Sequence, residues 1–79
     1  MIFMGNDKYL EKDINNMKCW AFRIAEKKWG INHIELAKLF HDQNLYEVID
    51  NGYDYLHLMS YNSVVDELKI ILGARGIKV

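Results

Sequence analysis

The chain contains no proline, so no position along its 79 residues forbids an α-helix by ring geometry. Helix ends must then be set mainly by glycine and asparagine, which tolerate the backbone conformations found at turns. The glycines are Gly5, Gly30, Gly52, Gly73 and Gly76, and they divide the chain into segments of helical length. The absence of proline and the spacing of the glycines predict an all-α fold of four to five short helices in a single domain, residues 1–79.

The first helix is predicted from about Asn6 to Trp29. Apolar side chains recur in this segment at intervals of three and four residues, which places them on one helix face: Ile14, Met17, Ala21, Ile24 and Ala25. Gly30 follows at a position suited to a left-handed C-terminal cap.

The next two helices are predicted from capping signals. Asn32 is a good N-cap, and Glu35 stands three residues later, as a capping box requires. This second helix is expected to stop at Asn44. A third, short helix is expected from Leu45 to Asp50, ended by Asn51 and Gly52.

The last part of the chain is more ambiguous. Residues 53–59 alternate partly like a strand, but a lone strand has no partner, so a short helix or turn capped by Asp54 is favoured. A loop over 60–62 then leads to a last helix, capped by Ser63 and ended by Gly73. A β alternative stays open for residues 64–65 and 69–72. Residues 74–79 are expected to form a tail that frays.

The predicted core is built from the apolar stripes of these helices. Its members are Ile24, Leu36, Leu39, Phe40, Leu45, Ile49, Leu56, Leu68 and Leu72. Such a small domain buries a modest share of its surface, about 60–65%.

Charge is distributed unevenly along the chain, although the net formal charge is only −1. Residues 1–38 carry +2, residues 39–67 carry −6 with no lysine or arginine, and residues 68–79 carry +3. We therefore expect an acidic side and a basic side, and a field of this kind steers encounter with a complementary partner.

Tyrosines are concentrated in the acidic block. Tyrosine is apolar in body and polar at its tip, and it is enriched at protein interfaces. Covering the small core is the alternative role for these rings. The predicted partner-binding residues are Asp42, Tyr46, Glu47, Asp50, Tyr53, Asp54, Tyr55, His57 and Tyr61. The tyrosines would serve as anchors, the carboxylates would steer the partner, and the neutral His57 ring would fix the loop.

The sequence offers no catalytic or cofactor motif. Cys19 lies in mid-helix, where a thiol is not acidified, and it is expected to be a buried or half-buried structural residue. His33 and His41 are eight residues apart, a poor spacing for a shared ion, so no metal and no cofactor are predicted. We expect a non-enzymatic, cytoplasmic protein without a membrane segment, able to self-associate.

A DNA-binding regulator is the alternative function. Residues 25–40 are predicted as a helix, a turn and a second helix, an order found in helix-turn-helix proteins. The second helix, 32–42, would contact the bases, yet Lys38 is its only lysine or arginine. The sequence therefore favours a protein partner over nucleic acid.

From Ala25 to Leu72 the chain resembles a family of short bacterial proteins, domain of unknown function 3791. The similar stretches are Gly30-Ile31, Glu35-Leu36-Ala37-Lys38-Leu39-Phe40, Tyr53-Asp54-Tyr55-Leu56-His57 and Val64-Val65-Asp66-Glu67-Leu68. The chain departs from the family pattern at Ser60, where a glycine is expected, and at Ser63, where an aromatic residue is expected.

The resemblance implies a helical domain without an established activity. Members of the family are often encoded beside small proteins that resemble ADP-ribosyltransferases, which implies a toxin and its antidote. By this analogy the chain would be the binding, non-catalytic member, an antitoxin-like partner of a small bacterial protein.

Overall fold

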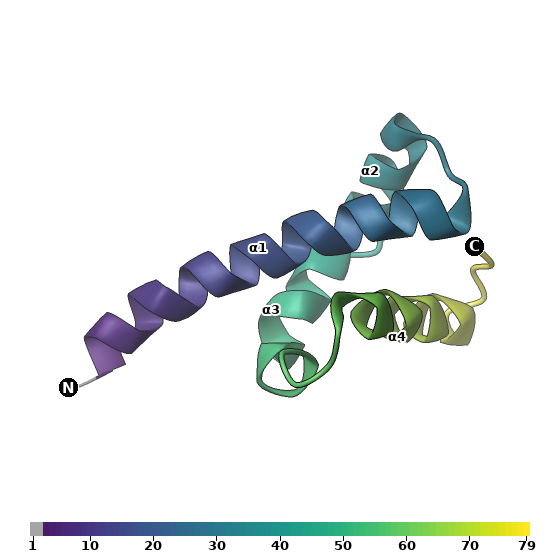
Figure 1. Ribbon diagram of the computed structural model, residues 1–79. Helices are drawn as coiled ribbons and strands as arrows, with labels where there is room; N and C mark the ends of the chain where they lie inside the picture. The colour runs from purple at the N-terminus through teal and green to yellow at the C-terminus, as the bar shows by residue number, and fades with distance from the viewer. Residues whose placement is uncertain (1–2) are drawn as a thin grey trace.

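The structure is a computed structural model that describes residues 3–79, with side chains from residue 11 onward. It contains four helices: α1 (Phe3–Trp29), α2 (His33–Asp42), α3 (Leu45–Leu56) and α4 (Tyr61–Ala74), as Figure 1 shows. Residues 3–79 form no strand. The all-α prediction is therefore confirmed, and the β alternative for residues 64–65 and 69–72 is wrong.

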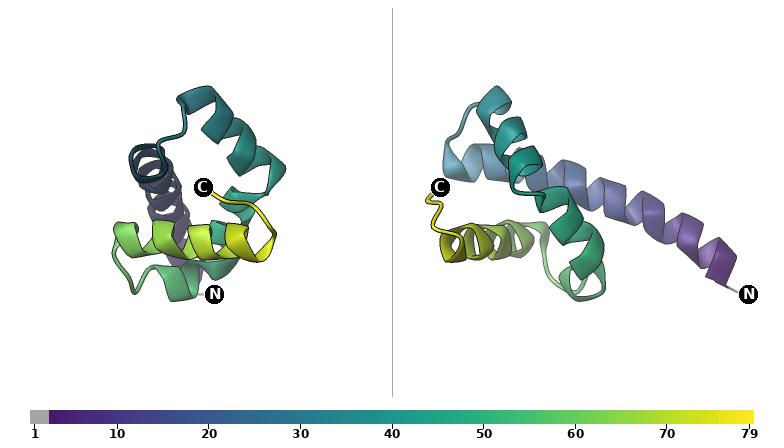
Figure 2. Two further views of the ribbon diagram at one scale, coloured as in Figure 1. Left: turned by 90° about the vertical axis from the view of Figure 1, so that its right-hand side faces the viewer. Right: turned by 180° about the vertical axis from the view of Figure 1, so that it is seen from behind.

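The long first helix sets the shape of the molecule. α1 has 27 residues, a length of about 40 Å at the usual helical rise, and the molecule measures 43 × 23 × 22 Å. The other three helices pack around the C-terminal part of α1, and its N-terminal part projects beyond them (Figures 1 and 2). The helix begins earlier than the predicted start near Asn6.

The turn between α1 and α2 follows the capping prediction. Gly30 has φ of +66°, and its N–H donates to the Glu26 carbonyl at 3.1 Å. The Asn32 side chain then accepts a hydrogen bond from the Glu35 N–H at 2.9 Å and caps α2. Both helix ends form where local side-chain chemistry predicts them.

The third helix is longer than predicted. It continues through Asn51 and Gly52 to Leu56, so the predicted end at Asp50 is wrong. Gly52 is not among the residues with positive φ. Ile49 and Leu56 lie on the same side of the helix and are 0% and 5% exposed. Burial of these side chains outweighs the helix penalty of one glycine, about 1 kcal/mol.

Replacing Gly52 by alanine is expected to stabilise the protein by about 0.5–1 kcal/mol. A Cβ at this position would meet only Leu56 side-chain atoms, at 3.5 and 3.7 Å, which is ordinary contact. Gly30→Ala is the matched control, and it should destabilise the protein because position 30 is left-handed. Urea unfolding measures the change in the free energy of unfolding for both variants. Loss of stability in Gly52→Ala would show that the helix does break there.

The last helix begins three residues earlier than predicted. Ser60 is its N-cap, and the Ser60 Oγ accepts a hydrogen bond from the Ser63 N–H at 3.2 Å. The predicted cap at Ser63 and the predicted loop over 60–62 are therefore wrong. The helix continues past Gly73 to Ala74, and the predicted fraying tail packs back instead, with the Ile77 N–H donating to the Leu72 carbonyl at 2.9 Å.

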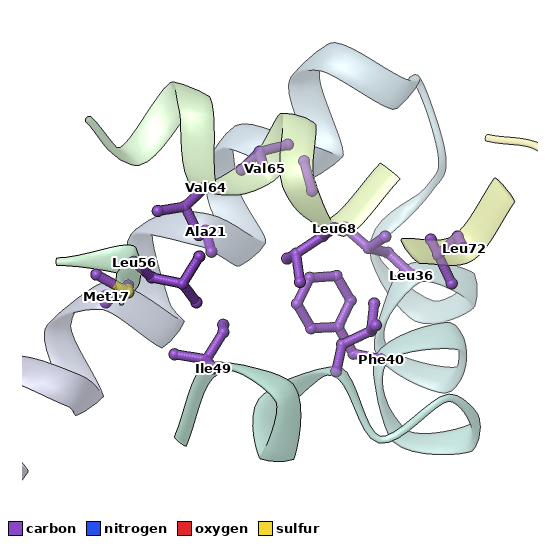
Figure 3. Close-up of a cluster of buried hydrophobic side chains, with 12 residues drawn as sticks. Met17, Ala21, Leu36, Phe40, Ile49, Leu56, Val64, Val65, Leu68 and Leu72 are labelled. Atoms are coloured by element: carbon purple, nitrogen blue, oxygen red, sulfur yellow. The ribbon is translucent and has the colours of Figure 1, made fainter. Parts of the chain in front are cut away.

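The core lies where all four helices meet, and Figure 3 shows the Phe40 ring pointing into its middle. Its most deeply buried members are Met17, Ala21, Ala25, Leu36, Phe40, Leu45, Ile49, Leu56, Val64, Val65, Leu68 and Leu72. Ile24 and Leu39, predicted to be core residues, are only partly buried against this cluster. The described residues include no buried polar side chain.

Candidate protein-contact site

The predicted contact residues lie in two groups, joined by α3. The first group comprises Asp42, at the end of α2, and three residues in the first half of α3: Tyr46, Glu47 and Asp50. The second group comprises Tyr53, Asp54 and Tyr55 in the last turn of α3, and His57 and Tyr61 after it. Because α3 is continuous, residues 46, 50, 53 and 54 fall within about a third of its circumference, on the side nearest α1. Tyr55 lies on the opposite side of the helix.

Tyr46 belongs partly to the core. Its side chain is 37% exposed, and its ring centroid lies 5.1 Å from that of Phe40. Burial, and to a smaller extent the neighbouring Cys19, raises the pKa of the Tyr46 phenol above its ordinary value of 10.0. The residue combines the two roles that the sequence left open, covering the core and facing solvent.

This raised pKa predicts a loss of stability in alkali. The unfolded chain releases the phenolic proton near its ordinary pKa of about 10, while the folded chain still holds it. The stability that Tyr46 contributes through its raised pKa is therefore fully present below about pH 10, and it is lost as the pH rises through the pKa of the folded state. Urea midpoints between about pH 8 and pH 11 should fall less steeply in Tyr46→Phe than in the parent. Equal slopes would contradict the assignment.

The acidic block does not form one continuous patch. The Asp50 carboxylate contacts the Lys18 ammonium at 2.8 Å, and the Asp66 carboxylate contacts the Lys28 ammonium at 3.0 Å. Both bases belong to α1, so the basic first part of the chain neutralises two acids of the middle block. Such exposed pairs contribute little stability, about 0–1 kcal/mol each, but they remove Asp50 from the acidic surface.

Asp42 and Glu47 lie together beside a cavity of about 460 Å³ at the α2–α3 junction. Arg75 reaches the same cavity from the end of α4 and donates to the Gln43 carbonyl at 2.6 Å and to its Oε1 at 3.2 Å. The two carboxylates are exposed and line the same cavity as the exposed Arg75, whose positive charge lowers the negative potential there.

The second group gathers where α3 turns into α4. We call this region the corner, and it comprises Tyr53, Asp54, Tyr55, His57, Leu58 and Tyr61. Tyr53 packs partly against the core and stacks on His57, with ring centroids 5.3 Å apart. Burial, then the nearby Asp13 carboxylate and the Tyr61 phenol, raise the pKa of Tyr53. These interactions hold the inner side of the corner in place.

The outer side of the corner is apolar and open to solvent. Leu58 is 77% exposed, Tyr55 is 60% exposed, and Tyr61 is 37% exposed. Tyr55 and Leu58 are one turn apart, since the Leu58 N–H donates to the Tyr55 carbonyl at 3.2 Å. Sequence reasoning missed Leu58, which lies in the turn directly after α3.

A separate groove of about 410 Å³ lies between α1, α2 and the start of α3. Its less polar lining comes from Cys19, Phe22, Ala37 and Tyr46, and its polar lining comes from Arg23, Glu26 and His33. Cys19 is exposed, so the expectation of a buried or half-buried thiol is wrong. On the 3.6-residue period, position 19 turns away from the Met17–Ala21–Ala25 stripe that carries the packing of α1.

The helix of the DNA-binding alternative, α2, presents a mixed surface. His33, Ile34 and Lys38 are exposed, but so are the carboxylates Glu35 and Asp42. These two acids and Lys38 line the same shallow cavity. Carboxylates on both sides of the single lysine repel a phosphate backbone, so the geometry adds no support to this alternative.

Within the described part of the chain, no three His, Cys, Asp or Glu side chains gather in a metal-binding arrangement. None of the helices α1–α4, over their described residues, has the length and apolar character needed to cross a membrane. Comparison with family models, curated proteins and solved structures finds no significant match. The family resemblance noted from the sequence therefore stays a prediction.

Proposed function

We propose that the chain is a non-catalytic, cytoplasmic protein-interaction module that binds a partner protein through the corner. The observation that carries this proposal is the exposure of Tyr55 and Leu58, at 60% and 77%, at the turn that ends α3. A tyrosine and a leucine side by side in solvent can lose their contact with water only by docking against another surface. Aromatic anchors of this kind dominate the energy of many interfaces.

Charge favours a partner with lysine or arginine beside its apolar contact. Asp54 is exposed and lies between Tyr53 and Tyr55 in the sequence, and residues 39–67 contain no lysine or arginine. Among the side chains of residues 11–79, none forms an ion pair with Asp54. A basic group on the partner would meet a free carboxylate at the edge of the apolar patch, which favours fast and selective encounter.

The ordered inner side of the corner supports the same function. Tyr53 is fixed between the core and the His57 ring, and the Ser60 cap fixes the start of α4. A surface that is already ordered loses less conformational entropy on binding. An antitoxin that covers a toxin's active cleft is one concrete form of this module, and it depends on the family resemblance.

The proposal is tested by affinity capture from an extract of the native cell, with matched surface variants. Tyr55→Ser with Leu58→Ser, and separately Asp54→Lys, should weaken capture of the specific partner by at least about tenfold. Ile34→Ser and Ile70→Ser are the controls, because these side chains are 79% and 64% exposed but lie on α2 and α4.

Undiminished capture by both corner variants would overturn the proposal. Equal loss in the corner and control variants would also overturn it, since the effect would then reflect general surface hydrophobicity. A gel shift of duplex DNA at low salt, lost on Lys38→Glu, would instead favour the DNA-binding alternative.

A further inference from the structure

The groove and the corner have complementary chemistry. The groove has a volume of about 410 Å³ and apolar walls from Phe22, Ala37 and Tyr46, which is within the range of sites that hold apolar groups. The corner presents Tyr55 and Leu58 on one exposed turn. The groove therefore offers apolar side chains that the corner can contact, beside the polar residues Arg23, Glu26 and His33.

The groove is lined by charges of both signs, Arg23 and Glu26, and the corner carries the carboxylate of Asp54. Arg23 lies over the Trp20 ring at 5.5 Å and forms no ion pair with a side chain of residues 11–79. The neighbouring acid, Glu26, already faces His33 at 3.7 Å. Asp54 is the free carboxylate of the corner. A cation beside the groove and an anion beside the exposed Leu58 favour contact between the two surfaces.

One chain cannot join its own two surfaces. Tyr46 and Tyr55 are separated by nine residues of α3, about 13 Å along the helix axis, and they project to opposite sides. The corner of one molecule can therefore fill only the groove of another. Contact of this kind is head-to-tail, which produces closed rings or open chains rather than a two-fold dimer.

We propose that the groove is the docking site for the corner of a second copy of this chain, with Leu58 and Tyr55 in the groove and Asp54 facing Arg23. This inference rests on the proposed docking role of the corner. The contact is small, and weak interfaces of that size have dissociation constants of about 10 µM to 1 mM. The protein is thus monomeric when dilute and associates as its concentration rises.

Sedimentation velocity of the full chain, from about 10 µM to 1 mM, measures this association. A corner variant carries Tyr55→Ser with Leu58→Ser, and a groove variant carries Arg23→Glu with Ala37→Glu. Each variant alone should remain monomeric over the whole range. Ile34→Ser and Ile70→Ser should associate like the parent, and circular dichroism checks that every variant is folded.

Mixing the two variants provides the decisive result. The corner variant keeps an intact groove and the groove variant keeps an intact corner, so a 1:1 mixture should form heterodimers, at least about tenfold more tightly than either variant alone associates. The assembly should not grow beyond the dimer, because the two surfaces left unoccupied in the heterodimer are the mutated corner and the mutated groove. A parent chain that stays monomeric at about 1 mM, or a mixture without heterodimers, would overturn the inference.

The two proposals fail separately. If the parent chain stays monomeric while the corner variants fail to capture the partner, only the proposed self-association is overturned. In the opposite case, mixing the two variants restores association, but the corner variants still capture the partner as well as the parent does. That result would overturn only the proposed binding of another protein.

Discussion

Phe40→Ala is expected to lower the free energy of unfolding by about 3–5 kcal/mol, the largest effect of any substitution considered for this chain. Phe40 is fully buried, and its ring lies 5.2 Å from that of Phe22 and 5.1 Å from that of Tyr46. Figure 3 shows it at the centre of the cluster. A domain of this size has only about 4–8 kcal/mol of stability, so the variant should be largely unfolded at physiological temperature.

Thermal and urea unfolding, followed by circular dichroism, measure this loss. Ile34→Ala is the control, since its side chain is 79% exposed and should shift the unfolding free energy by no more than about 0.5 kcal/mol. A loss below about 1 kcal/mol in Phe40→Ala would contradict the central position of this ring.

Ala21→Leu is expected to destabilise the protein by about 1–3 kcal/mol through overpacking. Ala21 and Ala25 are both 0% exposed, and α1 packs most extensively against α4. Alanine at these positions lets the two helices approach closely. Leucine has nearly the same helix propensity as alanine, so the substitution changes packing and leaves the intrinsic preference of the helix almost unchanged.

Ala74→Leu is the matched control for this substitution. Ala74 is the exposed last residue of α4, where a larger side chain meets solvent. Its urea midpoint should equal that of the parent. If Ala21→Leu were as stable as the control, the close approach of α1 would be contradicted.

The parts of the fold that depend on local chemistry could be predicted from the sequence. The left-handed Gly30 and the Asn32 cap form as expected, because a glycine without a Cβ and a side-chain oxygen act within one turn. The apolar spacing of Leu36, Phe40 and Ile49 also identified three residues that are fully buried.

The errors arose where tertiary packing outweighed local signals. Asn51 and Gly52 form a strong turn signal, but Ile49 and Leu56 bind the continuing helix to the core. Ser60 and Ser63 are both acceptable N-caps, and in the structure the Ser60 Oγ caps α4 by accepting the hydrogen bond of the Ser63 N–H. Neither helix boundary can be predicted from the few residues around it alone.

The contact site could be predicted only in part. Composition identified the tyrosines and acids of residues 42–61, but it could not show that Lys18 neutralises Asp50 or that Tyr46 packs on Phe40. The Lys18–Asp50 contact joins residues far apart in the sequence, and the Tyr46–Phe40 contact depends on how α2 and α3 pack against each other. Leu58 was missed because it lies in the turn that follows α3, and the position of that turn depends on the end of α3, which was predicted at Asp50 and lies at Leu56.

The central claim, that the corner is a docking surface, is tested most directly by nuclear magnetic resonance on the labelled chain. Amide shifts are recorded as the captured partner is added. The account predicts that the largest changes occur at Asp54, Tyr55 and Leu58, and that Ile34 and Ile70, equally exposed apolar positions, stay unchanged. Shifts confined to α2, with the corner unaffected, would contradict it.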